Sequence, residues 1–355
     1  MVLDFKQTHG YARFEMDRRI FDLYSAICSF DQLKASARLA KKGVRKNLSL
    51  LSFWSELDSN ILHVQKELLL QTYTPRGYTE FMLLDPKPRK IQAACFADRV
   101  VHHSLCKSLV PHFERSYLSH SFACQKGKGN HRAVQQAQVF ARLFQTGYYL
   151  KLDIKHCFET IDHCVLLKRI SSRIGCAQTL WLTEAIIRNG GQQGKGLPIG
   201  NLTSQHFANF YLDVLDHYCV ERLHTPGFIR YMDDIVLFSH SKDHLEEILG
   251  ELTLWLPSQL QLQIKHSSTQ LHPISHGIPF LGFRIFPHCI RFQQSRKRRF
   301  IHNWKKCSLI EEAKQSLHYS SLIAWSTQAN TLQLRKNLIQ EGRLQSLLQP
   351  CEPWR

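Results

Sequence analysis

Residues 229–238 read IRYMDDIVLF, a run in which the acidic pair Asp233 and Asp234 interrupts apolar and β-branched residues. Two adjacent aspartates are poor strand formers, whereas the residues on either side favour strands. The pattern therefore predicts two short strands joined by a tight hairpin turn at Asp233–Asp234. An isolated acidic pair is usually no more than a polar turn, so a catalytic role requires other carboxylates close by.

A further carboxylate lies in the segment Tyr149–Ile154 (YLKLDI), which also has a strand pattern. Alternation places its aliphatic residues on one face and Lys151 and Asp153 on the other. If this strand neighbours the hairpin, three carboxylates converge. Such a group can hold two Mg²⁺ ions, which bind carboxylate and carbonyl oxygens and neutralise charge during phosphoryl transfer.

The chain is strongly basic. Its 355 residues include 46 Lys and Arg against 29 Asp and Glu, which gives a formal net charge of +17. Because 43 % of the residues are apolar, the chain can also bury a substantial core. This surplus of positive charge predicts a polyanionic partner, most commonly nucleic acid, and the alternative is a merely basic soluble protein.

The 11 cysteines are scattered, without Cys-x-x-Cys pairs or histidines at zinc-ligand spacing, so neither a zinc site nor a disulfide framework is indicated. The pair His102–His103 is expected to be structural. Residues 1–19 carry early acidic residues and no apolar core segment, unlike a signal peptide, and no run approaches the ~20 apolar residues of a membrane span. We therefore expect a cytoplasmic protein without membrane contact.

The remaining segments are distinguished by their periodicity. Apolar residues at three- and four-residue steps predict helices within 17–75, at 98–113 and at about 203–223, whereas prolines and glycines between 75 and 88 mark short extended pieces. The loop Gln125–Gly129 lacks the spacing of a phosphate-binding P-loop. The segment from Arg291 is basic and then helical. We expect one mixed α/β body with a small helical C-terminal appendage.

Several motifs together resemble those of reverse transcriptases. Tyr231-Met232-Asp233-Asp234 is similar to the family's YxDD signature, and Asp153 is followed by Phe158 as in its Asp-x-x-x-x-Phe strand. Further similarities, in the family's order, are the fingers motifs at 86–91 and 98–103, the glycine-rich start of a helix at 197–205 (LPIGNLTSQ) and the hairpin before the thumb at 280–283 (FLGF). The resemblance covers residues 60–300 approximately.

This resemblance implies an α+β, right-hand polymerase fold. N-terminal helices and fingers would occupy residues 1–145, an antiparallel-sheet palm with late fingers elements 146–288, and a short basic helical thumb 289–355. It also implies that Asp153 and Asp233 bind two Mg²⁺ ions, assisted by the backbone carbonyl of Ile154, while Asp234 completes the charge. The catalytic residues would be Asp153, Asp233 and Asp234.

The nucleotide site is implied in the same way. Phe158 would lie under the sugar of the incoming nucleotide and exclude a ribose 2′-OH, which selects deoxynucleotides. Lys87 and Arg89 would hold the triphosphate, since Arg can bind phosphate oxygens bidentately and Lys acts as a point charge. Gly200, next to Ile199, would let the backbone approach the nascent base pair.

Contacts with template and primer would set affinity and salt dependence rather than sequence choice. The resemblance assigns them to the fingers loop, to the start of the helix after Gly200, and to the two residues before the acidic pair. The residues are Lys126, Lys128, Ser204, Gln205, Tyr231 and Met232.

One departure from the family concerns leaving-group chemistry. Many members have a lysine, just before a threonine, that is thought to protonate pyrophosphate. Here Ser268 precedes Thr269 in that segment. Lys265 or His266 could substitute.

A second departure points to a subtype. Most family members have Gln at position 199 and a Ser-Pro step after it, whereas this chain has Ile199 and the step Ser204-Gln205. That pattern resembles diversity-generating retroelement enzymes, relatives of group II intron and retron enzymes that misincorporate opposite template adenines. It implies an RNA template, a DNA primer and product, deoxynucleoside triphosphates and a small basic accessory protein, in a prokaryotic or phage-encoded system.

Three alternatives remain. The first is a retron-like or defence-associated reverse transcriptase, and the second is a nucleic-acid-binding relic that has lost catalysis. The third, an RNA-synthesising polymerase, is disfavoured by Phe158. Nothing resembles a maturase or endonuclease domain, which disfavours a full group II intron protein.

Overall fold

The computed structural model describes residues 20, 22–43, 48–84, 88–307, 309 and 312–341; Lys87 and the signal-peptide expectation for residues 1–19 lie outside them. The chain forms two compact units, each assembled from three separate segments. The first unit contains residues 1–119, 154–218 and 251–264, and the second contains 120–153, 219–250 and 265–355. The division into fingers, palm and thumb at residues 145 and 288, which the resemblance implies, stays a prediction.

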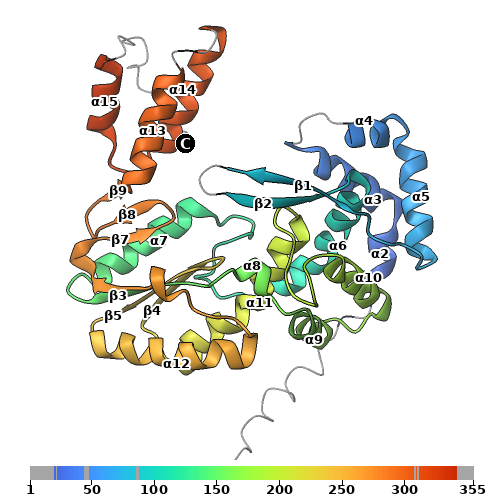
Figure 1. Cartoon of the computed structure of the whole chain (residues 1–355), viewed down its shortest axis with the longest axis horizontal. Coiled ribbons are helices and arrows are strands. Elements are labelled where there is room, and N and C mark those ends of the chain that lie inside the picture. Colours follow the sequence, from blue (N-terminus) through green and yellow to red (C-terminus); the bar gives the residue numbers. More distant parts are fainter. Residues whose placement is uncertain are drawn as a thin grey trace, which may run out of the picture. The chain divides into compact units, whose positions relative to one another are not determined.

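The first unit is mainly helical (Figure 1). Helix α6 (Phe96–Glu114) packs against α3 (Phe30–Lys41) and α11 (Leu202–His217), where Phe113 stacks on Phe210 with ring centroids 4.1 Å apart. The helices expected within 17–75 and at 98–113 are confirmed in the described residues. The remaining helices are α2 (Tyr24–Cys28), α4 (Leu48–Ser55), α5 (Leu57–Leu69), α8 (Cys157–Thr160), α9 (His163–Arg173) and α10 (Ala177–Arg188), and the π-helical turn η3 (Tyr218–Arg222) follows α11.

An antiparallel hairpin of β1 (Tyr78–Leu83) and β2 (Arg89–Ala94) belongs to the same unit. Its second strand is held by the segment before α11. The amide N–H of Gln92 donates to the carbonyl of Ile199 (2.9 Å), and the buried Asn201 side chain accepts from the Ala94 N–H (3.1 Å) and donates to the Gln92 carbonyl (2.7 Å). Asn201 therefore fixes β2 against the glycine-rich segment.

The second unit is built on a four-stranded antiparallel sheet in the order β4-β5-β3-β6. Helix α7 (Asn130–Leu143) covers one face, where Phe140 packs with Tyr149 and Phe238 in the core. Gly227 is required on this face, because a Cβ there would lie 2.9 Å both from the ring of Phe144 and from Cβ of Phe238. The strands are β3 (Tyr148–Asp153), β4 (Gly227–Tyr231), β5 (Asp234–Ser239) and β6 (Gln270–Pro273).

The hairpin predicted around the acidic pair is present, but its predicted turn is wrong by one residue. Tyr231 pairs with Asp234, so the turn consists of Met232 and Asp233, and Asp234 is the first residue of β5. Met232 adopts a left-handed backbone conformation with φ +54°. A two-residue turn with positive φ matches the twist of paired strands, and the side chain pattern alone did not fix which two residues form it.

A three-stranded antiparallel sheet follows in this unit: β7 (Ile278–Phe280), β8 (Phe283–Ile285) and β9 (Ile290–Phe292). Leu281 and Gly282, both with positive φ, form the turn of the hairpin expected at 280–283. Helices α13 (Gln294–Cys307), α14 (Glu312–Ser326) and α15 (Leu332–Glu341) then pack around Phe300 and Trp304. Helix α12 (Lys242–Leu260) begins in this unit and its residues from Glu251 belong to the first, while η4 (His266–Ser268) and η5 (Ile274–His276) are short 3-10 turns.

The mixture of helices with antiparallel sheets confirms the α+β class. In the described ranges, no helix combines the length and the apolar character that crossing a membrane requires.

Candidate active site

Asp153 and Asp234 occupy opposite positions on neighbouring strands. Asp153 ends β3, Asp234 begins β5, and the antiparallel register pairs them directly. Side chains paired in this way have Cβ atoms roughly 4.5–5.5 Å apart. Asp233 is the adjoining residue of the turn. The structure therefore brings together, within one unit, the three carboxylates that were singled out in the sequence.

The sheet face that carries these carboxylates changes character along its length. At one end Tyr149, Val236 and Phe238 are fully buried against α7 and its neighbours. At the other end, the same face presents Asp153 and Asp234, which are only partly buried. The core thus holds the strands rigidly while the acidic end stays accessible.

Lys151 lies between these two zones on the face of β3 that bears Asp153. Its ammonium group is 3.1 Å from Oδ1 of Asp234. That oxygen is buried and makes no hydrogen bond of good geometry. The pKa of Asp234 is raised to about 6, mainly by burial and also by the charges of Asp233 and Asp153, while Lys151 opposes the rise. Lys151 therefore only partly offsets the concentrated negative charge around Asp234.

This arrangement fits a divalent cation. A buried carboxylate oxygen without a hydrogen bond and carboxylates that repel one another are both relieved by a hard positive ion. Among the described residues, no three His, Cys, Asp or Glu side chains form a ready-made cage for one ion. An open site of this kind suits a hard divalent ion that keeps several waters and takes one or two carboxylates from the protein.

Asp153 is held from its other side by the segment 265–268. The Ser268 hydroxyl donates to Oδ2 of Asp153 at 3.3 Å, and the Lys265 ammonium lies 3.9 Å from the same oxygen. The backbone N–H of Lys265 also donates to the Asp153 carbonyl at 2.8 Å. Of the two residues considered as substitutes for the family's lysine, Lys265 therefore lies beside the carboxylates, whereas no contact with them is seen for His266, which is exposed.

In the first unit, Phe158 and Gly200 belong to one hydrogen-bonded region. The carbonyl of Phe158, in α8, accepts from the N–H of Leu197 at 2.7 Å. Gly200 has φ +114°, and a Cβ there would lie 2.7 Å from Cγ2 of Ile91. Both the backbone conformation and the lack of space thus require glycine. Phe158 and Ile199 are partly buried.

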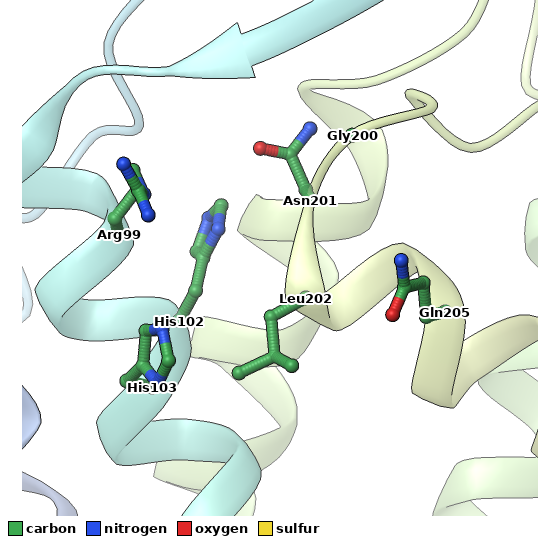
Figure 2. A pocket seen from close by; sticks show the side chains of 7 residues that line it. All are labelled: Arg99, His102, His103, Gly200, Asn201, Leu202 and Gln205. Carbon is green, nitrogen blue, oxygen red and sulfur yellow. The ribbon is translucent and has the colours of Figure 1, made fainter. Parts of the chain in front are cut away.

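A small pocket opens beside Gly200 (Figure 2). It has a volume of about 200 Å³, and Arg99 and two histidines of α6 face the start of α11 across it. Burial lowers the pKa of His102 to about 4 and also lowers that of His103, with the Arg99 charge contributing to both. Both imidazoles are consequently neutral near pH 7, and Arg99 supplies the positive charge. The lining residues are Arg99, His102, His103, Gly200, Asn201, Leu202 and Gln205.

The other residues singled out in the sequence have varied surroundings. Arg89 is exposed at the start of β2, and Ser204 is buried in α11, whereas Gln205 is exposed. Lys126 is exposed in its loop, but the Lys128 ammonium donates to the Ser121 carbonyl at 2.7 Å and so supports the loop from inside. Tyr231 and Met232 are partly buried in the second unit.

Sequence reasoning missed Lys151 as the partner of Asp234 and Arg99 as a pocket residue. Strand alternation had placed Lys151 on the face of Asp153, which was the available signal for the first. The DRVVHH segment contains Arg99, His102 and His103 at helical spacing, yet only packing against α11 shows that they share a pocket.

The family model described as "Reverse transcriptase (RNA-dependent DNA polymerase)" matches residues 85–285, more than half of the chain. Protein YkfC of Escherichia coli K12 is 22 % identical over 254 residues, which are 59 % of this chain and 66 % of YkfC. A putative COX1/OXI3 intron 2 protein of Saccharomyces cerevisiae is 18 % identical over 251 residues, 53 % of this chain and 29 % of that protein. The matches thus span less than two thirds of either relative.

Among solved structures, telomerase from Candida albicans in complex with a fragment of telomeric RNA is 11 % identical with a TM-score of 0.47, covering 81 % of this chain and 61 % of that one. Apo telomerase from Candida tropicalis, truncated from its C-terminal domain, has the same identity of 11 % and TM-score of 0.47, covering 68 % of this chain and 60 % of that one.

Proposed function

This chain belongs to the reverse transcriptase family, and we propose that it is an RNA-directed DNA polymerase that adds deoxynucleotides to a primer 3′-OH. The observation that carries this proposal is the direct pairing of Asp153 with Asp234, with Asp233 in the adjoining turn. The basic charge of the chain agrees with a nucleic-acid partner.

The cofactor that we propose is Mg²⁺, as two ions, within a family that uses divalent metal ions. Asp153 and Asp233 would hold both, with the Ile154 carbonyl and Asp234 assisting. When bound, the ions would neutralise charge on the transferring phosphoryl group and its attacking and leaving oxygens. The chain's own contribution is positional, because Lys151 holds Asp234 and Ser268 holds Asp153.

The nucleotide-binding residues that we propose lie in the fingers motifs and beside the glycine-rich segment. Phe158 excludes the ribose 2′-OH and Arg89, with Lys87, binds the triphosphate. Ile199 and Gly200 contact the nascent base pair. The hydrogen bond between the Phe158 carbonyl and Leu197 supports this grouping, since it ties the ring's helix to the segment that carries Ile199.

We assign the pocket beside Gly200 to the template strand. Its side chains include one guanidinium, two neutral imidazoles and the Gln205 carboxamide, whereas the Asn201 carboxamide is already hydrogen-bonded to β2, and none of the lining residues is acidic. That set can donate and accept hydrogen bonds with a base and attract a phosphate. Gln205, singled out from the sequence, lines it; Lys126 and Lys128 of the fingers loop, Ser204, Tyr231 and Met232 are the other residues proposed to support template and primer.

For the subtype, we propose a diversity-generating retroelement enzyme, encoded by a prokaryote or phage and active in the cytoplasm with a small basic accessory protein. The support is Ile199 with the Ser204-Gln205 step. An aliphatic residue in place of a hydrogen-bonding Gln would loosen selection of the incoming nucleotide. A template repeat beside the gene that differs from a variable repeat only at adenines would support this subtype, whereas the absence of such repeats would favour a retron-like enzyme.

The activity is tested by primer extension on an RNA template with deoxynucleotides and Mg²⁺, comparing the wild-type chain with Asp233→Asn. Asp243→Asn is the matched control, because Asp243 is an exposed aspartate in α12. Extension by the wild type and the control, but not by Asp233→Asn, is expected. A wild-type chain that binds primer and template without extending, with and without a candidate accessory protein, would favour the non-catalytic relic. Sequencing of the product then shows whether errors cluster opposite adenine.

A further inference from the structure

Arg230 is a fully buried arginine in β4, immediately before Tyr231, and its side chain is 0 % exposed. A guanidinium stays protonated in proteins, so its burial is unfavourable unless it is hydrogen-bonded. Most buried strand positions of this sheet hold aliphatic or aromatic side chains. Packing alone therefore does not explain why a permanently charged side chain lies in the core, three residues before Asp233.

The contacts of Arg230 lead toward the acidic turn. Nη1 donates to the backbone carbonyl of Met232 at 3.3 Å, and Nη2 donates to the hydroxyl of Ser121 at 3.0 Å. Ser121 is itself fully buried. The backbone of Arg230 is held by the same neighbouring segment, since its N–H donates to the His120 carbonyl and its carbonyl accepts from the Phe122 N–H, both at 3.0 Å.

The Met232 carbonyl belongs to the peptide group that joins Met232 to Asp233. Met232 has a left-handed backbone conformation, which an unbranched residue adopts only when its surroundings impose it. A hydrogen bond to that carbonyl limits rotation of the peptide group. It thereby limits the direction in which the side chain of the next residue, Asp233, leaves the backbone. Ser121 holds the other end of the guanidinium and so fixes its position.

We propose that Arg230 is a positioning residue that, through the Met232 carbonyl, orients Asp233 for binding of a divalent metal ion. The inference rests on the metal site of the proposed function. Arg230 does not touch the reacting atoms. It anchors the turn to the segment 120–122, in which Ser121 and Phe122 are buried, and Ser121 is the second residue that positions the turn.

The test is a titration of the full-length chain with Mn²⁺, in which electron paramagnetic resonance measures the free ion. Only the Mn²⁺ sites that are lost in Asp233→Asn are assigned to the acidic turn. This comparison excludes Mn²⁺ ions that bind to histidines elsewhere in the chain. Arg230→Gln is expected to raise the Kd of these sites for Mn²⁺ about tenfold or more, the range seen when groups that orient metal ligands are removed. The Mg²⁺ concentration for half-maximal primer extension should rise in parallel, with a smaller change in the KM for deoxynucleotide.

Two further variants keep the test decisive. Ser121→Ala removes only the hydroxyl that holds Nη2, so it should fold even if Arg230→Gln does not, and it should raise the same Kd severalfold. Arg169→Gln is the matched control, because its guanidinium also donates to a backbone carbonyl, that of Phe210 at 3.3 Å, in the other unit. It should lower the melting temperature without changing the Kd.

A Kd within twofold of the wild type in folded Arg230→Gln or Ser121→Ala would overturn the proposal and leave Arg230 as a purely structural residue. Mn²⁺ binding that Asp233→Asn does not reduce would overturn it as well, together with the metal site. A wild-type chain that binds Mn²⁺ through Asp233 yet extends no primer would count against polymerase activity alone, and the Kd comparison would still decide the role of Arg230.

Discussion

Asp153 and Asp234 face each other across two antiparallel strands, and Lys151, two residues before Asp153, forms an ion pair with Asp234 at 3.1 Å. Like charges directly opposite each other destabilise a sheet. The chain nevertheless places a third carboxylate, Asp233, in the adjoining turn. Lys151 beside Asp234 and Lys265, 3.9 Å from Asp153, offset only part of this concentrated negative charge, which favours the binding of cations.

Replacement of Lys151 by Met should destabilise the chain by about 1–3 kcal/mol, because it removes the partner of a buried carboxylate oxygen. Mg²⁺ should restore part of this loss and stabilise Lys151→Met more than the wild type, since the ion takes over the role of the lysine. Urea unfolding with and without Mg²⁺ measures both effects. Lys242→Met, which removes an exposed pair with Glu246, should change stability little and respond to Mg²⁺ like the wild type. Equal stabilisation of all three proteins by Mg²⁺ would contradict the account of Lys151.

Gly200→Ala should lower activity and reduce stability by about 1–3 kcal/mol, because φ is +114° and the new Cβ would meet Ile91 at 2.7 Å. Gly194→Ala is a matched control with φ +75° and no atom within 4 Å of the new Cβ. Gly194→Ala should therefore show only the loss of stability that comes from placing an alanine at positive φ. The double variant Ile91→Ala, Gly200→Ala should recover part of the loss, which thermal melts and extension rates can measure. The absence of any coupling between positions 91 and 200 would show that crowding is not the cause.

Phe158→Ala should relax sugar selection, because a smaller side chain leaves room for a ribose 2′-OH. We expect the preference for deoxynucleotides over ribonucleotides to fall about tenfold or more. Single-nucleotide incorporation with each sugar gives the ratio of kcat/KM values. If ribonucleotides were excluded as strongly as in the wild type, Phe158 would be a packing residue and not a sugar gate.

His102 should make the first unit sensitive to acid. Burial holds its pKa near 4 in the folded chain, below the ordinary value of about 6.5. At a pH between these two pKa values, His102 is protonated in the unfolded chain but neutral in the folded chain. The free energy of unfolding therefore falls as the pH falls, by up to about 3 kcal/mol from this group. Urea unfolding at about pH 7 and about pH 5 measures the slope. His102→Gln should flatten it, whereas His63→Gln, at a histidine whose side chain is 68 % exposed, should not. A slope that His102→Gln leaves unchanged would refute this assignment.

The sequence predicted the periodic elements well, and its limits have physical causes. Helix α6 was expected at 98–113 and spans Phe96–Glu114, because its apolar spacing is repeated over several turns. The hairpin turn was misplaced by one residue, because register depends on which residues pair across the strands, here Tyr231 with Asp234.

Parts of the candidate site depended on contacts between distant segments. Strand alternation placed Lys151 on the face of Asp153, but only the pairing of β3 with β5 shows that its partner is Asp234. An arginine such as Arg230 is rarely fully buried, so its burial could not be anticipated. Nothing in the sequence indicated that the Lys128 ammonium would donate to the Ser121 carbonyl. The pocket beside Gly200 joins residues about 100 positions apart in the chain.

The most direct test of the central claim is extension of a labelled primer on an RNA template by the full-length chain, with deoxynucleotides and Mg²⁺. We predict RNA-dependent extension that falls by about a thousandfold or more in Asp153→Asn and in Asp233→Asn, and that persists in Asp243→Asn. Extension that survives unchanged in both active-site variants would contradict the claim that these carboxylates carry the reaction.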